Sequence, residues 1–205
     1  MSRYIRALKV KEFDSNGNAV FYSAEELGTD DGRDYAGDGI PDFTYGITVN
    51  LAYKNFDLTV FANGVQGVEK FLCAQRPDLP IANVPEFVYN HRWTASNPSD
   101  AIFPKPTTNM GYSVDYAGAD FWAFDASYFK IKQIQLGYTL PQSLLKKLNI
   151  KGLRVYGSIE NAFTFTKYPG NDPESMAGTY GANIALDRVS YPSTKNFMFG
   201  VNFSF

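Results

Sequence analysis

Apolar residues alternate with small or polar residues over the last nine positions of the chain. The alternating set is Phe197, Phe199, Val201, Phe203 and Phe205, and on a β-strand these side chains share one face. The residues between them are small or polar apart from one methionine. Transmembrane β-barrels end on such a strand, so the pattern predicts a C-terminal barrel-closing strand. A soluble β-sandwich strand alternates in the same way, and the alternation alone leaves both possibilities open.

Residues 43–53 form the second clear amphipathic segment. Every odd position is aromatic or aliphatic, whereas the even positions carry Thr, Gly, Asn and Ala. The segment has the length of roughly 9–11 residues that a tilted strand needs to cross a bilayer. Its aromatic ends and aliphatic middle resemble the two interfacial girdles of a barrel wall. After a tight turn at Lys54 and Asn55, a strand over 56–65 places Asp57 on the polar face, which suits a wet interior better than a packed core.

Weaker patterns predict further strands joined by alternately short and long connections. Strands are expected over 3–13, 19–22, 127–140 and 151–165, a polar loop over 25–42, and a helical turn over 141–148. The segment from Gly67 to Phe124 contains six prolines and little periodicity, and loops of this length are ordinary on the outside of a transmembrane barrel. We therefore predict an all-β fold: the C-terminal antiparallel strands of a large transmembrane β-barrel, a fragment and not a closed barrel. The whole of 1–205 belongs to it, with long external loops near 67–124 and 166–193.

Composition excludes some classes of protein. The 205 residues have a mean hydropathy of −0.26 and no apolar run of about 18 residues, which excludes transmembrane helices. A net charge of −2 argues against a nucleic-acid partner. The single cysteine Cys73 and single histidine His91 predict neither an internal disulfide nor a histidine-based metal site. The first ten residues lack the apolar region of a signal peptide, so we expect either a cytosolic protein or the downstream piece of a longer chain.

Eight segments resemble, in the right order, recurrent C-terminal segments of one family. They are residues 41–46 (PDFTYG), 92–94 followed by Asn97-Pro98, 126–132 (ASYFKIK), 136–141 (LGYTLP), 153–156 (LRVY), 160–161 (EN), 163–168 (FTFTKY) and 172–174 (DPE). The family is the SusC/RagA-like TonB-dependent outer-membrane transporters, and the resemblance runs from about Asp14 to Phe205.

This resemblance implies a bacterial outer-membrane barrel of about 22 strands with a plugged lumen, of which this chain holds the last five or six. It further implies contact with the lipid bilayer and the import of oligosaccharides or peptides under a SusD-like surface lipoprotein. Transport would be powered by the TonB complex, which such a protein contacts through an N-terminal part. Nothing in this chain resembles a TonB box or a plug, so we expect a C-terminal fragment that transports nothing alone.

Candidate site residues fall into three groups, each with an alternative. Asp14, Asn16, Asn18 and Glu25 have the spacing of a weak calcium loop, but Ala19 stands where that loop needs glycine. The favoured alternative is an Asn-Gly hairpin turn, and calcium is the one cofactor considered. The acidic run from Asp30 to Asp42 is more simply a solvated loop.

Aromatic residues in or beside the long segment form the second group, which we expect to stack on sugar rings or to contact the lid protein: Trp93, Trp122, Tyr112 and Tyr116. Packing within the loop is their alternative role. The third group, Arg154, Tyr156 and Glu160, shares the polar face of one strand and is expected to face the lumen.

We expect no enzymatic activity. Asp125, Ser127 and His91 form no recognisable triad motif, and no nucleophile-elbow sequence is present. The alternative function is a free-standing soluble β-sandwich that binds carbohydrate through loop aromatics. Its apolar faces would need a second sheet to cover them, so the sequence favours the transporter.

Overall fold

The computed structural model describes residues 4–72, 85–106, 118–146, 151–175, 186–187 and 191–205. The chain forms two compact units and alternates between them, so each is assembled from segments that are distant in sequence. Unit 1 comprises residues 1–41, 67–126 and 168–191, and unit 2 comprises residues 42–66, 127–167 and 192–205. No helix in the described part of the chain is long and apolar enough to cross a membrane.

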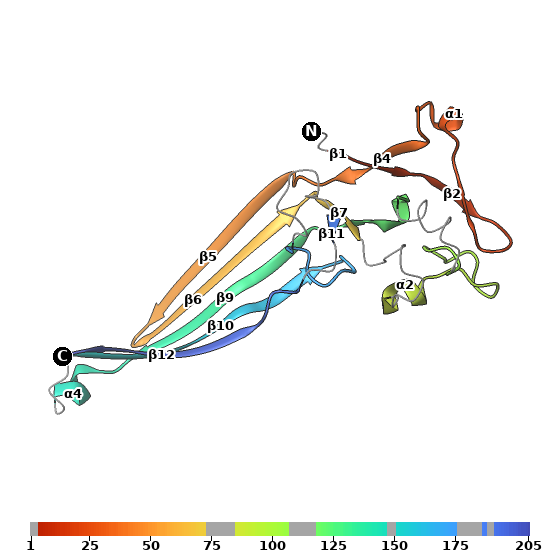
Figure 1. The fold of residues 1–205 in the computed structure, drawn as a ribbon. Helices are drawn as coiled ribbons and strands as arrows, with labels where there is room; N and C mark the ends of the chain where they lie inside the picture. The colour runs from red at the N-terminus through yellow and green to blue at the C-terminus, as the bar shows by residue number, and fades with distance from the viewer. Residues whose placement is uncertain (1–3, 73–84, 107–117, 147–150, 176–185, 188–190) are drawn as a thin grey trace. The chain divides into compact units, whose positions relative to one another are not determined.

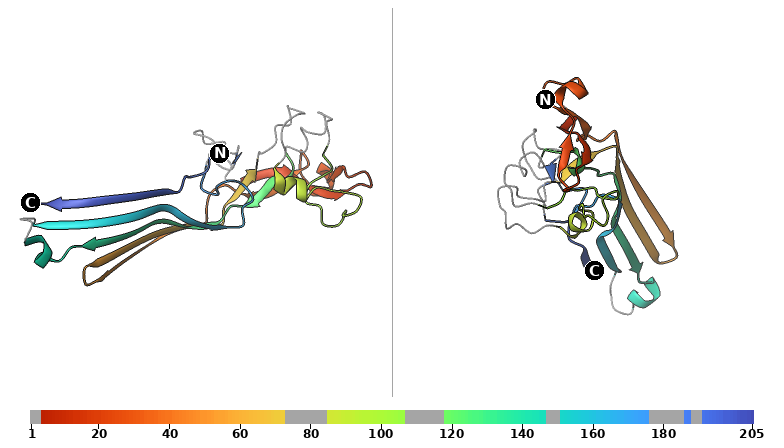
Figure 2. Two further views of the ribbon diagram at one scale, coloured as in Figure 1. Left: turned by 90° about the horizontal axis from the view of Figure 1, so that it is seen from below. Right: turned by 90° about the vertical axis from the view of Figure 1, so that its right-hand side faces the viewer.

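Unit 2 is a single antiparallel sheet of five long strands, which lie side by side in Figures 1 and 2. The order across the sheet is β12-β10-β9-β6-β5. The strands are β5 (Phe43–Tyr53), β6 (Phe56–Gln66), β9 (Tyr128–Thr139), β10 (Gly152–Thr166) and β12 (Asn196–Ser204). These are the strands that the alternation predicts, with ends that differ by one or two residues. The all-β fold class is confirmed.

Short connections join the strands at one end of the sheet. Lys54, with a positive φ of 52°, makes the tight turn between β5 and β6. The connection from β9 to β10 contains the short helix α4 (Gln142–Leu145), which follows Pro141 as its N-cap. At the other end of the sheet, the chain enters or leaves unit 1 at every strand. The alternation of short and long connections predicted from the sequence is therefore present.

A β-bulge in β9 keeps the apolar side chains on one face. Phe61 of β6 pairs with Gln133 and the next residue, Ala62, pairs with Ile131, which leaves Lys132 as an extra residue. The apolar residues of β9 accordingly stand at odd positions before the bulge, as Ile131 does, and at even positions after it, as Ile134 does. Opposite the bulge, Asn161 of β10 adopts a positive φ of 49°, which asparagine tolerates better than most residues.

Unit 1 is made of short elements. Two of its sheets are antiparallel pairs, β1 with β4 and β2 with β3, and the third has the order β11-β7-β8. The strands are β1 (Tyr4–Leu8), β2 (Val10–Phe13), β3 (Ala19–Phe21), β4 (Arg33–Asp38), β7 (Glu69–Leu72), β8 (Ala123–Asp125) and β11 (Leu186–Asp187). The helices are α1 (Ala24–Leu27), α2 (Glu86–Asn90) and the 3₁₀ turn η1 (Asp120–Trp122).

One expectation is wrong in part. The polar loop expected over 25–42 contains β4, whose sequence RDYAGD has almost no apolar residues. Its pairing with β1 comes from backbone hydrogen bonds, which leave no periodic signal. The long segment 67–124, predicted as an external loop, contains β7, α2, η1 and the first residues of β8.

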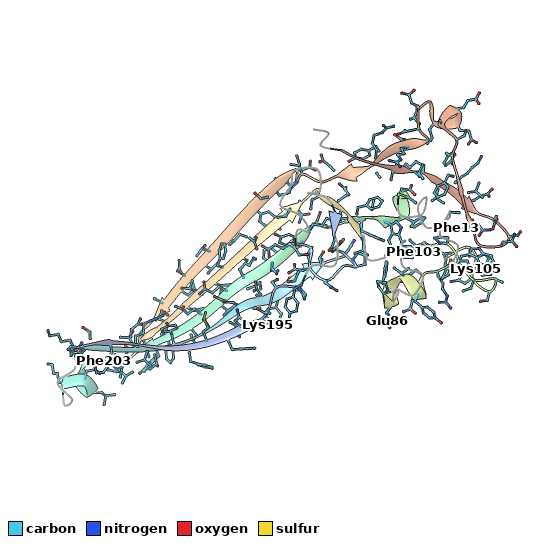
Figure 3. All side chains as sticks on the ribbon, in the orientation of Figure 1. Phe13, Glu86, Phe103, Lys105, Lys195 and Phe203 are labelled. Carbon is cyan, nitrogen blue, oxygen red and sulfur yellow. The ribbon has the colours of Figure 1, made fainter. Side chains whose placement is uncertain are left out.

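An aromatic cluster forms the core of unit 1. Phe103 is 1% exposed, and its ring lies 4.9 Å from the Trp122 ring and 5.8 Å from the rings of Phe87 and Phe121. Figure 3 labels Phe103 in this part of the molecule. The cluster joins α2, η1 and the strand β8 through Phe124, so the long segment has a hydrophobic core of its own.

Helix α1 is held by a capping box that also contacts β2. The Ser23 hydroxyl accepts a hydrogen bond from the Glu26 backbone N–H, and the Glu26 carboxylate accepts one from the Ser23 N–H. Lys11 of β2 lies 2.8 Å from the same carboxylate. The Lys11 hydrogen bond, followed by the Ser23 backbone, lowers the pKa of Glu26 from 4.5 to about 2.

We predict that acid loosens α1. A carboxyl whose pKa is lowered by folding stabilises the folded state fully above its unfolded pKa, here 4.5, and loses this effect as the pH falls toward 2. Amide hydrogen-exchange protection in α1 should therefore fall between pH 5 and pH 2. Glu26→Gln should remove this pH dependence, whereas Glu25→Gln should retain it; equal pH profiles in the two variants would contradict the assignment.

Candidate functional site

One face of the unit 2 sheet is continuously apolar. The register aligns one apolar or small residue from each strand in rows: Val49 with Val60, Ile134 and Ile159, and Leu51 with Leu58 and Leu136. Many side chains of this face are exposed, from 40% at Val155 to 88% at Phe199, whereas Ala62 is buried and Val60 and Ile134 are half-buried. Of the five C-terminal residues predicted to share one face, the four from Phe197 to Phe203 lie on this face of β12. All five are exposed. A face of this size requires an apolar environment.

Aromatic rings gather at both ends of the apolar face. At the end next to the long connections, Tyr45 stacks on Phe129 at 6.3 Å, and Phe129 stacks on Phe165 at 6.2 Å. At the short-turn end, Phe56 and Tyr138 lie 4.6 Å apart. From Phe43 to Tyr53 the strand spans about 34 Å, which at a tilt of 35–45° corresponds to a height of about 26 Å. This height matches the ≈25 Å apolar band of a transmembrane barrel, flanked by its two aromatic girdles.

The opposite face is polar and carries an ion pair. Arg154 of β10 donates two hydrogen bonds to the Asp57 carboxylate of β6, one of them from Nε at 2.9 Å. On the same face Thr59 donates to Asn50 at 2.9 Å, and Asn196 donates to Glu160 at 3.2 Å. A charged, hydrogen-bonding face opposite an apolar one is the arrangement that a water-filled lumen requires.

The structure places the predicted lumen residues together on this polar face. Arg154, Tyr156 and Glu160 pair with Thr139, Gly137 and Gln133 of β9, so all three point away from the apolar face. Their exposure to a lumen remains a prediction. Sequence reasoning missed that Asp57 is the partner of Arg154, because the two residues are 97 positions apart.

Of the loop aromatics, Trp122 is buried and Trp93 is not. Trp122 is 4% exposed within the Phe103 cluster, which favours the packing alternative for this residue. The Trp93 indole lies against Gly17, where an added Cβ would overlap the ring. Tyr112 and Tyr116 lie outside the described residues.

Trp93 lines a groove of about 710 Å³ in unit 1. Strand β2 and the following turn form one side, through residues 10–15, and residues 93–102 form the other. The second side is fixed by backbone hydrogen bonds from Trp93 to Phe103 and from Lys105 to Gly17. The lining combines the indole with Val10, Phe13 and Ile102 and with the Glu12 and Asp14 carboxylates, so it offers both apolar and hydrogen-bonding contacts.

Asp14 organises the hairpin between β2 and β3. Its carboxylate accepts hydrogen bonds from the backbone N–H groups of Asn16 and Asn18 and from the Asn18 amide. The Asn18 side chain and backbone lower the pKa of Asp14. This geometry shows the Asn-Gly hairpin, with Gly17 at φ 83°. Calcium binding by Asp14, Asn16, Asn18 and Glu25 remains a prediction; among the described residues no group of three or more His, Cys, Asp or Glu side chains is placed to hold a metal ion.

A buried lysine joins the two long connections within unit 1, and no sequence pattern indicates it. Lys70 of β7 is 4% exposed and donates to the carbonyl oxygens of Pro173 and Ser175. Burial lowers the pKa of Lys70, while Asp187 and Asp172 raise it. Asp187 also accepts a hydrogen bond of 2.7 Å from the Tyr168 hydroxyl. The ammonium therefore attaches residues 168–175 to the segment that follows β6.

Residues His91 and Asp125 belong to unit 1 and Ser127 to unit 2. The His91 ring nitrogen Nδ1 lies 2.8 Å from the carbonyl oxygen of Phe87, and its ring packs on the Phe87 ring. His91 is therefore engaged at the end of α2, which is a structural role.

Comparison with known proteins identifies relatives along most of the chain. TonB-dependent receptor P3 of Formosa agariphila is 32% identical over 187 residues, which are 88% of this chain and 18% of that receptor. TonB-dependent receptor SusC of Bacteroides thetaiotaomicron is 28% identical over 166 residues, 80% of this chain and 15% of SusC. The relatives of this chain are thus TonB-dependent receptors, SusC among them, and the chain matches a part of each. No family model matches it.

A solved structure agrees in fold. The RagAB peptide importer in its open-open state superposes on 98% of this chain and 22% of the matched chain, with a TM-score of 0.74 and 22% identity. The chain spans about a fifth of the length of the curated SusC-like relatives it matches. The family resemblance read from the eight segments is confirmed, as is the outer-membrane class of protein that it implies.

We predict that charge is tolerated on only one face of this SusC-like sheet. Val49→Arg places a cation at the middle of the apolar face and should destabilise the folded protein by about 2–4 kcal/mol. The neighbouring Asn50→Arg, on the polar face, should cost far less. The folded fraction of each variant is measured by heat-modifiable gel mobility of the full protein in detergent. Equal losses in both variants would contradict the assignment of the faces.

Proposed function

We propose that this chain contributes wall strands and loops to an outer-membrane importer that takes up oligosaccharides or peptides. The observation that carries the proposal is the single-layer sheet of unit 2, with a continuous exposed apolar face and a charged opposite face. A bilayer covers the first face and an aqueous lumen solvates the second. In hydrocarbon every backbone hydrogen bond must be made internally, which an antiparallel sheet achieves once neighbouring strands complete it.

The soluble β-sandwich is not favoured. Its apolar face would have to be covered by a second sheet at about 10 Å, but in this structure large side chains such as Phe199, Tyr53 and Leu51 remain exposed. In a sandwich, side chains of varied size interdigitate. Here the rings instead lie in rows at the two ends of the strands.

Partners and energy source follow from the family. The proposal includes a SusD-like surface lipoprotein as lid and TonB as the source of energy, both acting on the complete receptor. The names of the relatives support two parts of this proposal: the TonB-dependent receptors support TonB as the energy source, and the RagAB peptide importer supports peptides as a substrate class. Within this chain, the Trp93 groove is the part of unit 1 that we propose contacts substrate or lid.

Contact with lipid is tested by alternating labels on β12. In a Cys73→Ser background, an environment-sensitive fluorophore is attached to Val201→Cys or to the adjacent Asn202→Cys, and the full protein is reconstituted in vesicles. A quencher on the lipid chains should quench the label at position 201 strongly, and a water-soluble quencher should act on position 202. Quenching of both labels only by the aqueous quencher would contradict the wall and support a soluble domain.

Transport is tested separately from membrane insertion. Uptake of labelled oligosaccharides and peptides should require both the intact gene and a functional TonB. Trp93→Ala should lower uptake severalfold at an unchanged amount of protein in the outer membrane, because it removes the aromatic wall of the groove. Tyr89→Ala, an exposed residue outside the groove, is the matched control. Unchanged uptake in Trp93→Ala would exclude the groove from substrate or lid contact.

A further inference from the structure

A glycine lies directly beneath the ion pair on the polar face. Gly137 of β9 pairs with Asp57 of β6 on one side and with Tyr156 of β10 on the other. The Asp57–Arg154 pair therefore crosses β9 at Gly137 and connects two strands that are not neighbours. A Cβ at Gly137 would lie 2.5 Å from Asp57 Oδ1 and would overlap Arg154 Nη2. Only glycine leaves room for the two side chains to meet.

The same row continues to the next strand. The Arg154 guanidinium lies 5.0 Å from the centre of the Tyr156 ring, and this ring lies over Gly200 of β12, where an added Cβ would be 2.6 Å from Cε1. Asp57, Gly137, Arg154, Tyr156 and Gly200 thus form a lateral belt across β6, β9, β10 and β12. Two of the four strands contribute a glycine to it, and the other two contribute the side chains that cross those glycines.

We propose that this lateral belt is a register lock, which admits one alignment of β9 between β6 and β10. A strand that keeps its apolar face can slip only by an even number of residues, because a slip of one residue exchanges its faces. A slip of two places Gln135 or Thr139 opposite Asp57 in place of Gly137. Either residue brings a Cβ into the space between Asp57 and Arg154 and breaks the bidentate pair. The alternation of the strand does not distinguish these alignments, whereas the belt does.

The lock goes beyond the proposed function, because it concerns how the sheet selects its register and not what passes along it. A single-layer wall has no second layer whose packing would fix the alignment. The Asp57–Arg154 pair, which spans three strands on the polar face, fixes the alignment instead, because a bidentate Arg–carboxylate contact has strict geometry.

The register is read by cysteine cross-linking in the full protein, in isolated outer membranes and in a Cys73→Ser background. Thr59→Cys with Gln135→Cys reports the observed alignment, since these residues pair. Thr59→Cys with Gln133→Cys reports the slip of two that places Gln135 opposite Asp57. In the otherwise unchanged protein the first pair should cross-link and the second should not.

The decisive variant is Gly137→Ala. It should lower the ratio of in-register to slipped cross-link by roughly tenfold, the change that a clash of about 1.4 kcal/mol produces. Gly46→Ala is the matched control, because Gly46 lies on the polar face of β5 and an added Cβ there meets only ordinary contacts, the nearest at 3.7 Å. An unchanged ratio in Gly137→Ala would overturn the lock.

A charge exchange keeps the test decisive if Gly137→Ala fails to fold. Asp57→Arg and Arg154→Asp should each lower the ratio, and the double exchange should restore most of it, because the pair and not either charge acts as the lock. A double variant that remains as defective as the single ones would overturn the proposal. The outcome is independent of lipid quenching at position 201, so failure of the lock and failure of the proposed wall are distinguishable.

Discussion

The structure depends on one constraint: the described strands of unit 2 form a single sheet, without a second layer of their own to pack against. In a soluble β-protein the apolar face of each sheet is buried by another element, and interdigitating side chains fix the geometry. In unit 2 the sheet is instead held together by the backbone hydrogen bonds between its strands and by side-chain contacts between neighbouring strands. In a bilayer this ladder is strong, because hydrocarbon offers backbone groups no alternative partner. The hydrocarbon of the bilayer therefore provides the apolar environment that a hydrophobic core provides in a soluble protein.

Unit 1 follows the opposite logic. Its strands are short, and it is held by a buried aromatic cluster around Phe103 and by the buried ammonium of Lys70. A buried charge is tolerated only when it is paired and hydrogen-bonded, which the carbonyl oxygens of Pro173 and Ser175 and the Asp187 and Asp172 carboxylates provide. The described parts of the two long connections thus have a core of their own, able to hold the Trp93 groove in a defined shape.

The sequence was sufficient for the long strands and insufficient for most of unit 1. Residues 43–53 alternate because a bilayer and water on opposite faces impose a period of two, and the same cause operates along β6, β10 and β12. Strand β4 has no such period, because it is held by backbone pairing with β1. Lys70 could not be recognised either, since its partners are more than one hundred positions away. For Trp122 the sequence left stacking and packing open, and its burial depends on contacts that a linear pattern does not encode.

Glycine has a role in this sheet that composition does not reveal. Gly64 lies beneath the Tyr45 ring on the apolar face, and Gly200 beneath Tyr156 on the polar face. A strand glycine ordinarily weakens a sheet, because it loses more backbone conformational entropy on folding than other residues and has no side chain to pack. In a single layer, however, each such glycine receives a large side chain from the adjacent strand, so that contact between strands replaces contact between layers. The glycines that appear to be interruptions of the β-pattern are therefore the positions at which neighbouring strands are packed together.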